Sequence, residues 1–207
     1  MKLYLSSFRF GDHAKQLSNL YSNNKKVALI VNAWDAYPDG ERRLLGIQRE
    51  TEGLIQLGLQ PEILDLRTFF DKPADLAKKI TEFGGVWVTG GNTFALRRAF
   101  HYSGLDLWLQ ENRSDNNFVY GGYSAGVCVL SPELKGLELV DEPNVVPDGY
   151  KADVIWQGVG LIDFAFAPHF ESDHPESDMV TQEVEYMVKN GINYKALHDG
   201  EVIILEI

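Results

Sequence analysis

The residues with the clearest chemical potential form a Gly-x-Ser-x-Gly sequence at 122–126, with Ser124 at its centre. An apolar run at 118–121 precedes it and a second at 127–130 follows it, which predicts a buried strand, a tight turn and the start of a helix. Such a turn lifts a serine hydroxyl clear of the backbone, and the flanking glycines leave room for it. The segment therefore indicates a serine nucleophile, and its structural alternative is a serine that only caps a helix.

A serine hydroxyl needs a base before it can attack a carbonyl carbon. The chain has histidines at positions 13, 101, 169, 174 and 198. His169 follows a strand-like run at 164–167, and the carboxyl ends of parallel strands meet at one edge of a sheet. We therefore predict that His169 accepts the proton of Ser124, with His174 in the polar loop that follows as the second candidate.

The third member of such a site is an acid that orients the imidazole and stabilises its charged form. The segment between Ser124 and His169 offers several acids, namely Glu133, Glu138, Asp141, Glu142, Asp148, Asp153 and Asp163. The residue pattern by itself does not choose among them.

A second glycine turn, at residues 90–91, also lies between a strand-like run and a helical one. Its Gly91 N–H is positioned to act beside that of Ala125 as an oxyanion donor, because both turns are expected at the same edge of the sheet. The structural alternative is a helix start capped by Asn92 or Thr93. The turn is not a P-loop, because no Gly-Lys-Ser/Thr follows it.

The elements that must position these residues alternate between strand and helix patterns. Apolar runs typical of buried strands lie at 27–31, 62–66, 85–89, 118–121 and 164–167. Residues 40–58 and 180–187 carry apolar side chains at helical spacing. The runs at 194–198 and 202–207, on either side of the Asp-Gly pair at 199–200, predict an antiparallel closing hairpin.

Length and alternation predict one α/β domain over residues 1–207, with a doubly wound, mostly parallel sheet sandwiched by helices. A net charge of −11 argues against a nucleic-acid binder, which needs a cationic face. The single cysteine, Cys128, excludes an intramolecular disulfide and a thiolate-rich metal site. No membrane span or signal sequence is evident, so we expect a cytoplasmic protein with no metal or organic cofactor.

Three segments taken together resemble the peptidase E family of serine peptidases, family S51, whose best-known member is an aspartyl dipeptidase. They are Thr-Gly-Gly-Asn-Thr-Phe at 89–94, Gly-Tyr-Ser-Ala-Gly at 122–126 and Pro-His-Phe at 168–170. The resemblance extends over essentially the whole chain. It implies a flavodoxin-like α/β sandwich similar to class I glutamine amidotransferases, with serine in place of cysteine at the elbow.

The resemblance also implies roles for individual residues. Ser124 corresponds to the nucleophile and His169 to the general base, while the N–H groups of Gly91 and Ala125 correspond to the oxyanion hole. For the acid, the family pattern of an Asp close before a proline is matched best by Asp141, and Glu138 is the alternative.

One departure from the family concerns the substrate. The aspartyl dipeptidases have a Thr-Arg-Glu sequence whose arginine pairs with the substrate aspartate, whereas this chain has Thr-Gln-Glu at 181–183. Gln182 cannot form that charged pair, so we expect strict aspartyl specificity to be weakened or lost. In this interpretation Asn92, Thr93 and Gln182 contribute to substrate binding.

These observations predict a serine peptidase of dipeptidase or aminopeptidase type that cleaves small peptides through an acyl-enzyme, as a monomer or homodimer. An esterase-like hydrolase would share Ser124 but would favour His198 as its base, since such enzymes draw the histidine from near the C-terminus. A non-catalytic ligand-binding or sensor module with the same sheet is the alternative from another class. A nucleophilic Cys128 is a weaker hypothesis, because that residue is expected in the helix core.

Overall fold

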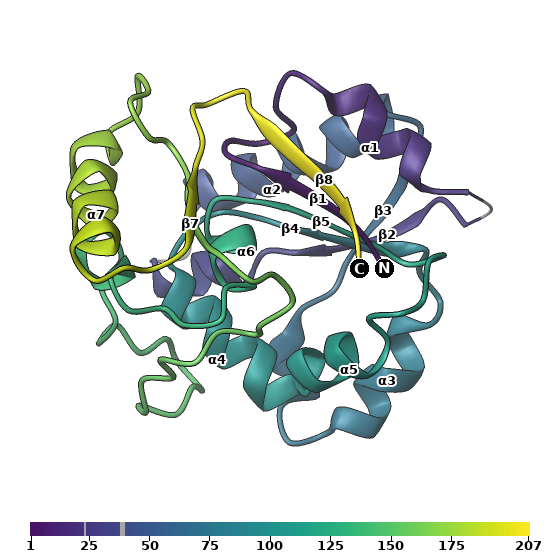
Figure 1. Cartoon of the computed structure of the whole chain (residues 1–207). Helices are drawn as coiled ribbons and strands as arrows, with labels where there is room; N and C mark the ends of the chain where they lie inside the picture. The colour runs from purple at the N-terminus through teal and green to yellow at the C-terminus, as the bar shows by residue number, and fades with distance from the viewer. Residues whose placement is uncertain (23, 38–39) are drawn as a thin grey trace.

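A computed structural model describes residues 1–22, 24–37 and 40–207, and its centre is a six-stranded sheet (Figure 1). The strands lie in the order β3-β2-β4-β5-β1-β8. Five of them run parallel and β8 runs antiparallel to β1. Their bounds are Lys2–Ser6 for β1, Lys26–Ile30 for β2, Gln60–Ile63 for β3, Gly85–Val88 for β4, Val119–Tyr123 for β5 and Val202–Glu206 for β8.

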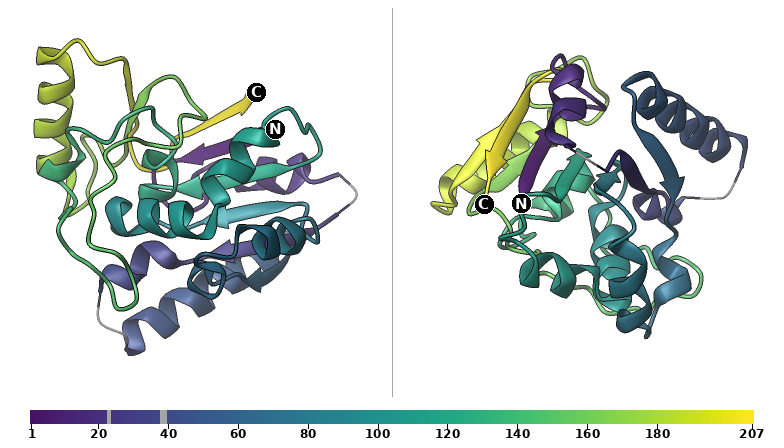
Figure 2. Two further views of the ribbon diagram at one scale, coloured as in Figure 1. Left: turned by 90° about the horizontal axis from the view of Figure 1, so that it is seen from below. Right: turned by 90° about the vertical axis from the view of Figure 1, so that its right-hand side faces the viewer.

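Helices cover both faces of this sheet (Figures 1 and 2). The α-helices are α1 (Ala14–Leu20), α2 (Glu41–Gln56), α3 (Pro73–Ile80), α4 (Thr93–Ser103), α5 (Leu105–Glu111), α6 (Ala125–Cys128) and α7 (Ser177–Lys189), with short 3-10 helices η1 (Asn32–Ala36), η2 (Leu66–Phe69) and η3 (Leu137–Leu139). Successive side chains of a strand point to opposite faces. In β2, accordingly, Val27 and Leu29 pack with α1 and α2, whereas Ala28 and Ile30 pack in the larger core with α3, α4, α5 and α6. The α/β sandwich expected from the sequence is confirmed.

The end of the chain departs from the sequence expectation. The strand-like run at 164–167 forms β6 (Ala165–Ala167), which belongs to a separate two-stranded sheet and pairs in parallel with β7 (Tyr194–Ala196). The expected C-terminal hairpin is therefore wrong, because β8 pairs with β1 of the main sheet and not with β7. The apolar residues of β7 and β8 meet different partners: β7 packs with α7, and β8 packs against the main core.

The apolar runs in the sequence do not predict strand β1, yet it lies in the interior of the main sheet. It is short, but it is flanked by β5 and β8, and four of its five residues are buried. Pairing with β8 brings the two ends of the chain together, and the Met1 ammonium donates a hydrogen bond to the Ile207 carbonyl (2.7 Å; Figure 1).

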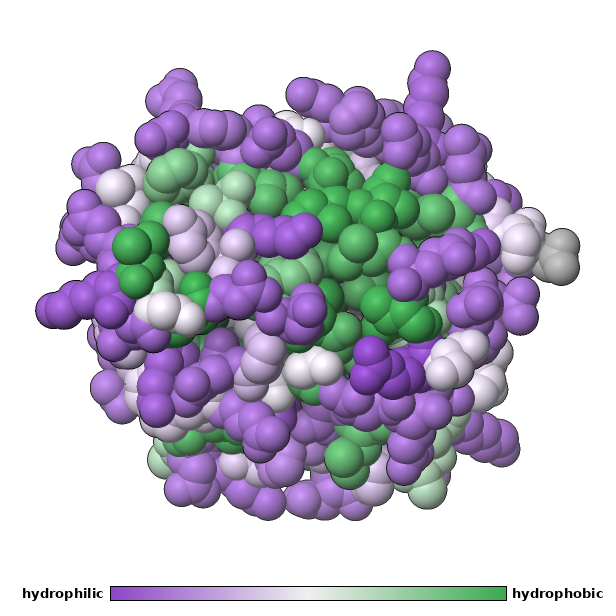
Figure 3. All heavy atoms as spheres, in the orientation of Figure 1, coloured by the Kyte–Doolittle hydropathy of each residue, from purple (hydrophilic) through white to green (hydrophobic). Residues whose placement is uncertain are grey.

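The edge strand β8 carries apolar side chains at the surface. Four of its five residues are only half buried, and apolar surface gathers over this part of the molecule in Figure 3. Of the helices in the described ranges, none combines the length and the apolar character that crossing a membrane requires.

Candidate active site

Ser124 lies in a sharp turn where β5 ends and α6 begins, as its sequence context predicts. Its backbone has φ 49° and ψ −121°, a conformation with positive φ that is costly for any residue other than glycine. The turn is pressed against β4: a Cβ atom added at Gly126 would lie 2.4 Å from the carbonyl oxygen of Val88. The glycines of the motif are therefore required by close backbone packing.

The second glycine turn lies against this elbow. A Cβ atom added at Gly90 would be 3.0 Å from the Cβ of Ser124, and Gly91 has φ +133°. Within the described ranges, neither the Gly91 N–H nor the Ala125 N–H donates a hydrogen bond to another group of the chain. Two backbone donors are thus available beside the Ser124 hydroxyl.

Asn92 and Thr93 begin α4 next to this turn, and both are buried. The Asn92 side-chain oxygen accepts a hydrogen bond from the Ala95 N–H (2.8 Å), and its amide donates to the Glu142 carbonyl (2.9 Å). Asn92 is therefore a helix cap whose side chain is already occupied by the protein. Thr93 lines the cavity next to Ser124.

His169 is held close to the elbow by the end of β1. The Ser124 N–H donates to the Ser6 carbonyl (3.3 Å), and the His169 N–H donates to the hydroxyl of the next residue, Ser7 (2.9 Å). Two adjacent residues of the chain thus anchor the two segments, and Pro168 lines the same cavity as Ser124. In the described part of the chain, no hydrogen bond joins the Ser124 hydroxyl to a histidine ring.

The acid beside His169 is Asp199, which corrects the expectation from the sequence. The Nδ1 atom of His169 lies 2.6 Å from Oδ1 of Asp199, and the same oxygen accepts a hydrogen bond from Ser7 Oγ (3.0 Å). The Asp141 carboxylate instead accepts the Thr93 N–H (2.7 Å), and the Glu138 carboxylate accepts the Gly136 N–H (2.6 Å).

The sequence does not identify Asp199 as the acid, for two reasons. It follows His169 along the chain, so a search between the serine and the histidine omits it, and the Asp-Gly pair at 199–200 is typical of a hairpin turn. In the structure this pair lies in the crossing from β7 to β8, between two different sheets. This connection between β7 and β8 places the Asp199 carboxylate next to His169.

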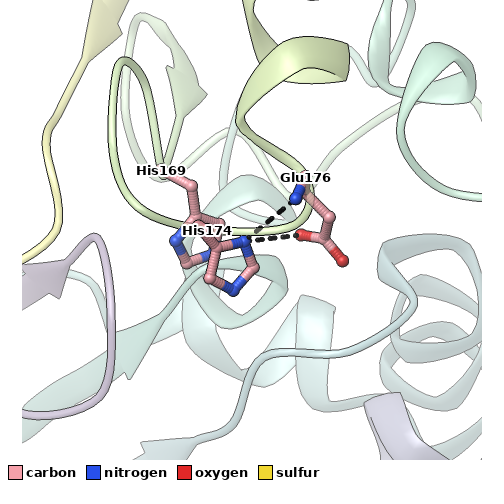
Figure 4. A group of neighbouring side chains, drawn as sticks. All are labelled: His169, His174 and Glu176. Carbon is pink, nitrogen blue, oxygen red and sulfur yellow. Dashed lines mark hydrogen bonds and ion pairs between the residues drawn. The ribbon is translucent and has the colours of Figure 1, made fainter.

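His174 stacks on His169, as Figure 4 shows. The ring centroids are 3.7 Å apart and the planes differ by 7°. The Nδ1 atom of His174 accepts the Glu176 N–H (3.3 Å) and lies 3.9 Å from the carboxylate of that residue. Burial lowers the pKa of both histidines, although Asp199 opposes this effect at His169. Both imidazoles are therefore neutral near pH 7, the form in which a histidine accepts a proton.

His169, His174 and Glu176 form a group whose possible ligand atoms lie within 4.8 Å of one another (Figure 4). Histidine and carboxylate side chains are common metal ligands. The two rings, however, are stacked in nearly parallel planes, so their in-plane lone pairs lie in separate planes and do not meet at one ion. This arrangement fits a metal only if a ring turns.

The cavity at Ser124 is small and has acidic walls. Three carboxyl groups line it. Asp141 lies in the loop after η3, Glu176 directly precedes α7, and Glu183 lies in the middle of α7. Burial raises the pKa of Asp141 to about 6, that of Glu176 to about 7 and that of Glu183 to about 8.

Gln182 is not among the residues that line this cavity, so its part in substrate binding stays a prediction. Its side chain is exposed on α7, and its Nε2 lies 3.4 Å from the Asp178 carbonyl. The next residue, Glu183, turns inward and is fully buried. A signal for this was present in the sequence, because Glu183 falls on the same helical stripe as Val180 and Met187.

Cys128 also lines the cavity, but it is buried in α6 and its Sγ donates to the Phe166 carbonyl (3.3 Å). Burial raises the pKa of this thiol, foremost among several effects. A thiol in that state is not the thiolate that nucleophilic chemistry needs.

Comparisons with known proteins agree with this architecture. The chain is 28% identical over 156 residues to an uncharacterized peptidase of Listeria monocytogenes, Lmo0363, and the match covers 74% of this chain and 72% of the relative. An uncharacterized peptidase of Listeria innocua, Lin0382, is 27% identical over 174 residues, which are 82% of this chain and 77% of that one.

Two solved structures have the same fold. A putative peptidase E protein from Listeria monocytogenes matches with a TM-score of 0.73 at 22% identity, over 100% of this chain and 98% of that one. A peptidase from an acI-B1 actinobacterium matches with a TM-score of 0.70 at 15% identity, over 99% and 83% of the two chains. Residues 6–206 match the model of peptidase family S51. The chain therefore belongs to peptidase family S51 and is a hydrolase of the serine-peptidase type.

Proposed function

We propose that Ser124, His169 and Asp199 form a catalytic triad that hydrolyses small peptides through an acyl-enzyme. The observation that carries this proposal is the 2.6 Å contact between His169 Nδ1 and Asp199 Oδ1, next to a serine held in a strained elbow. A carboxylate at Nδ1 keeps the proton on that nitrogen and leaves Nε2 free to accept the serine proton. Asp199 takes the role that the sequence suggested for Asp141.

In the first step His169 removes the Ser124 proton as the hydroxyl oxygen attacks the peptide carbonyl carbon. The N–H groups of Gly91 and Ala125 stabilise the negative charge on the carbonyl oxygen. His169 then protonates the leaving amine, and a water molecule activated by the same histidine releases the acyl group from Ser124.

The substrate class is short peptides cleaved after the N-terminal residue. The size of the site supports this choice, because the cavity that Ser124 lines is small and is bounded by α7. Strict specificity for N-terminal aspartate is not expected, since no lysine or arginine is among the residues that line the cavity in the described ranges.

The test is hydrolysis of a panel of aminoacyl p-nitroanilides and dipeptides, including Asp-X, by wild type and by Ser124→Ala. In parallel, a fluorophosphonate probe reports whether the Ser124 hydroxyl is activated. We expect cleavage and labelling by wild type and neither by the variant. A wild-type protein that is not labelled and cleaves nothing would contradict the proposal and favour the ligand-binding module.

A further inference from the structure

We propose that Ser7 is a positioning residue of the triad, and that its hydroxyl holds the His169 ring and the Asp199 carboxylate together. This inference rests on the proposed function and adds to it a residue that the sequence patterns do not single out. It is carried by the hydrogen bonds at the end of β1, by the backbone conformation of His169 and by the burial of the Ser7 side chain.

The chain at the end of β1 is hydrogen-bonded on both sides. On one side, the Ser124 N–H donates to the Ser6 carbonyl (3.3 Å). On the other side, the Ser7 N–H donates to the Glu201 carbonyl (3.1 Å), and Glu201 lies in the connection from β7 to β8 that also contains Asp199. The backbone of residues 6 and 7 therefore fixes the separation between the serine elbow and this connection.

The Ser7 hydroxyl joins the proposed base to its acid. Its oxygen accepts a hydrogen bond from the His169 N–H (2.9 Å). It lies within donating distance of Asp199 Oδ1 (3.0 Å) and of the Leu197 carbonyl (3.3 Å). The carboxylate is the nearer acceptor, and hydrogen bonds to charged acceptors are the stronger kind. Because a hydroxyl is a donor and an acceptor on one atom, Ser7 makes both contacts at once.

The backbone of His169 depends on this contact. His169 has φ 60°, a conformation that is costly for residues other than glycine and that persists only where the surroundings hold it. His169 is 1% exposed, and in the described ranges its N–H has no second acceptor. Without the Ser7 hydroxyl this N–H would be a buried donor without a partner, and the strained residue would lose its anchor.

The carboxylate depends on the same hydroxyl. The Asp199 side chain is 23% exposed, whereas Ser7 is 0% exposed. Without the Ser7 contact, the carboxylate would be free to turn toward water and away from His169. The residue after Ser7, Phe8, packs edge-on against the His169 ring, with 5.7 Å between the ring centroids. Residues 7 and 8 thus hold the base and its acid from one side.

The first test compares Ser7→Ala with wild type on the peptide substrate that wild type cleaves best. A hydrogen bond to a charged group contributes enough to change a rate by roughly 10- to 100-fold. We expect kcat of the variant to fall by that factor with KM little changed, because Ser7 acts on the base and its acid and not on the substrate. Ser7→Ala that is folded and keeps more than half of wild-type kcat would overturn the inference.

Two further variants bracket this result. Ser7→Cys retains a weaker donor, so it should lose less kcat than Ser7→Ala, and it takes the place of that variant if the alanine protein does not fold. Ser103→Ala is the matched control, because it removes a buried hydroxyl at the end of α4, where Ser103 donates to the Ala99 carbonyl (2.7 Å). The control should keep wild-type kcat. Thermal unfolding would show which of these proteins are folded.

A double-mutant cycle tests whether Ser7 acts through Asp199. Substitutions of residues that share one hydrogen-bond network have non-additive effects. The fold loss in kcat caused by Ser7→Ala should therefore be at least about 5 times smaller in the Asp199→Asn protein than in wild type. Equal losses in the two backgrounds would overturn the inference.

A proton NMR measurement separates this inference from the triad proposal, because it requires no turnover. The proton between His169 Nδ1 and Asp199 Oδ1, atoms that are 2.6 Å apart, should give a resonance far downfield that Asp199→Asn lacks. We expect Ser7→Ala to shift or broaden this resonance and Ser103→Ala to leave it unchanged. An unchanged resonance in Ser7→Ala would overturn the inference while the triad proposal stands. Absence of the resonance in wild type, together with absence of hydrolysis, would contradict the triad proposal itself.

Discussion

The Ser124 elbow and the His169–Asp199 pair meet at the same end of β1, but they are built in different ways. The elbow consists of contiguous residues at 122–126, held in place by close contact with β4. The pair joins residues 30 positions apart, one following β6 and the other in the crossing from β7 to β8. A local motif therefore positions the proposed nucleophile, whereas the pairing of distant strands positions the proposed base and its acid.

The two regions also differ in what surrounds them. The elbow is covered by the main core of the sandwich, while the histidine segment belongs to a small cluster around β6, β7 and α7. The same small cluster supplies Glu183, a buried acid without a partner. Substitutions in the two regions should accordingly have separable effects on chemistry and on stability.

The largest expected effect distinguishes the two stacked histidines. Replacing His169 by Gln should lower kcat by about 10⁶-fold, as loss of a triad base does in serine proteases. Replacing His174 by Gln should lower it by no more than about 10-fold, because its Nδ1 atom contacts Glu176 and not Asp199. Steady-state kinetics on the best p-nitroanilide would measure both. A larger loss in the His174 variant would assign the base to that residue.

The second prediction concerns the acid. In Asp199→Asn the amide cannot hold His169 in the required tautomer, so kcat should fall by about 10³- to 10⁴-fold. Thermal unfolding of the variant should show that it remains folded. The exposed Asp163, changed to Asn, is the matched control and should retain wild-type kcat. If Asp199→Asn keeps more than a tenth of wild-type activity, the pair does not act as proposed.

The third prediction concerns the effect of the buried Glu183 carboxyl on stability. Burial raises the pKa of Glu183 from 4.5 to about 8. Between pH 4.5 and pH 8, therefore, this carboxyl is ionised in the unfolded chain but keeps its proton in the folded protein. The free energy of unfolding of wild type should therefore fall as pH rises through this window. Glu183→Gln has no such carboxyl, so its free energy of unfolding should not fall for this reason. From pH 5 to pH 8, the stability of the variant relative to wild type should therefore increase by about 2 to 4 kcal/mol.

Urea denaturation at the two pH values would measure this difference. Glu185→Gln, on the exposed side of the same helix, should follow the pH dependence of wild type. Parallel pH profiles for wild type and Glu183→Gln would show that the buried carboxyl does not keep its proton.

The smallest expected effect tests the elbow. In Gly126→Ala the new methyl group would lie 2.4 Å from the Val88 carbonyl oxygen, so β4 and the turn must separate. We expect a loss of about 1 to 3 kcal/mol in the free energy of unfolding, with slower fluorophosphonate labelling of Ser124. Chemical denaturation and labelling rates would measure the two effects. An unchanged variant would show that the elbow does not depend on this contact.

Much of the sandwich could be predicted from contiguous patterns. The apolar runs at 27–31, 85–89 and 118–121 coincide closely with β2, β4 and β5, and the amphipathic stretch at 40–58 contains α2. These elements are recognisable because periodicity and burial agree within a single segment. The sequence does not reveal β1, because its short apolar run is not distinctive and only pairing with β5 and β8 makes it an interior strand.

The C-terminal region shows where sequence patterns mislead. An Asp-Gly pair between two strand-like runs predicts a hairpin, since local turn chemistry is all that the pattern contains. Here β8 instead pairs with β1 at the edge of the main sheet, and β7 pairs with β6. Which strand is paired with which depends on surfaces far apart along the chain, and so does the contact between His169 and Asp199.

The sequence by itself determined the family, the α/β class, the Ser124 elbow, the glycine turn at 90–91 and the candidacy of His169. Each of these depends on residues that are neighbours along the chain, where steric limits on the backbone and the need to bury apolar side chains act directly. Only the tertiary structure decided that Asp199 contacts His169, that Asp141 caps α4, and that Glu183 faces the cavity while Gln182 faces solvent. These outcomes depend on strand pairing and on helix rotation against the core, which no single segment encodes.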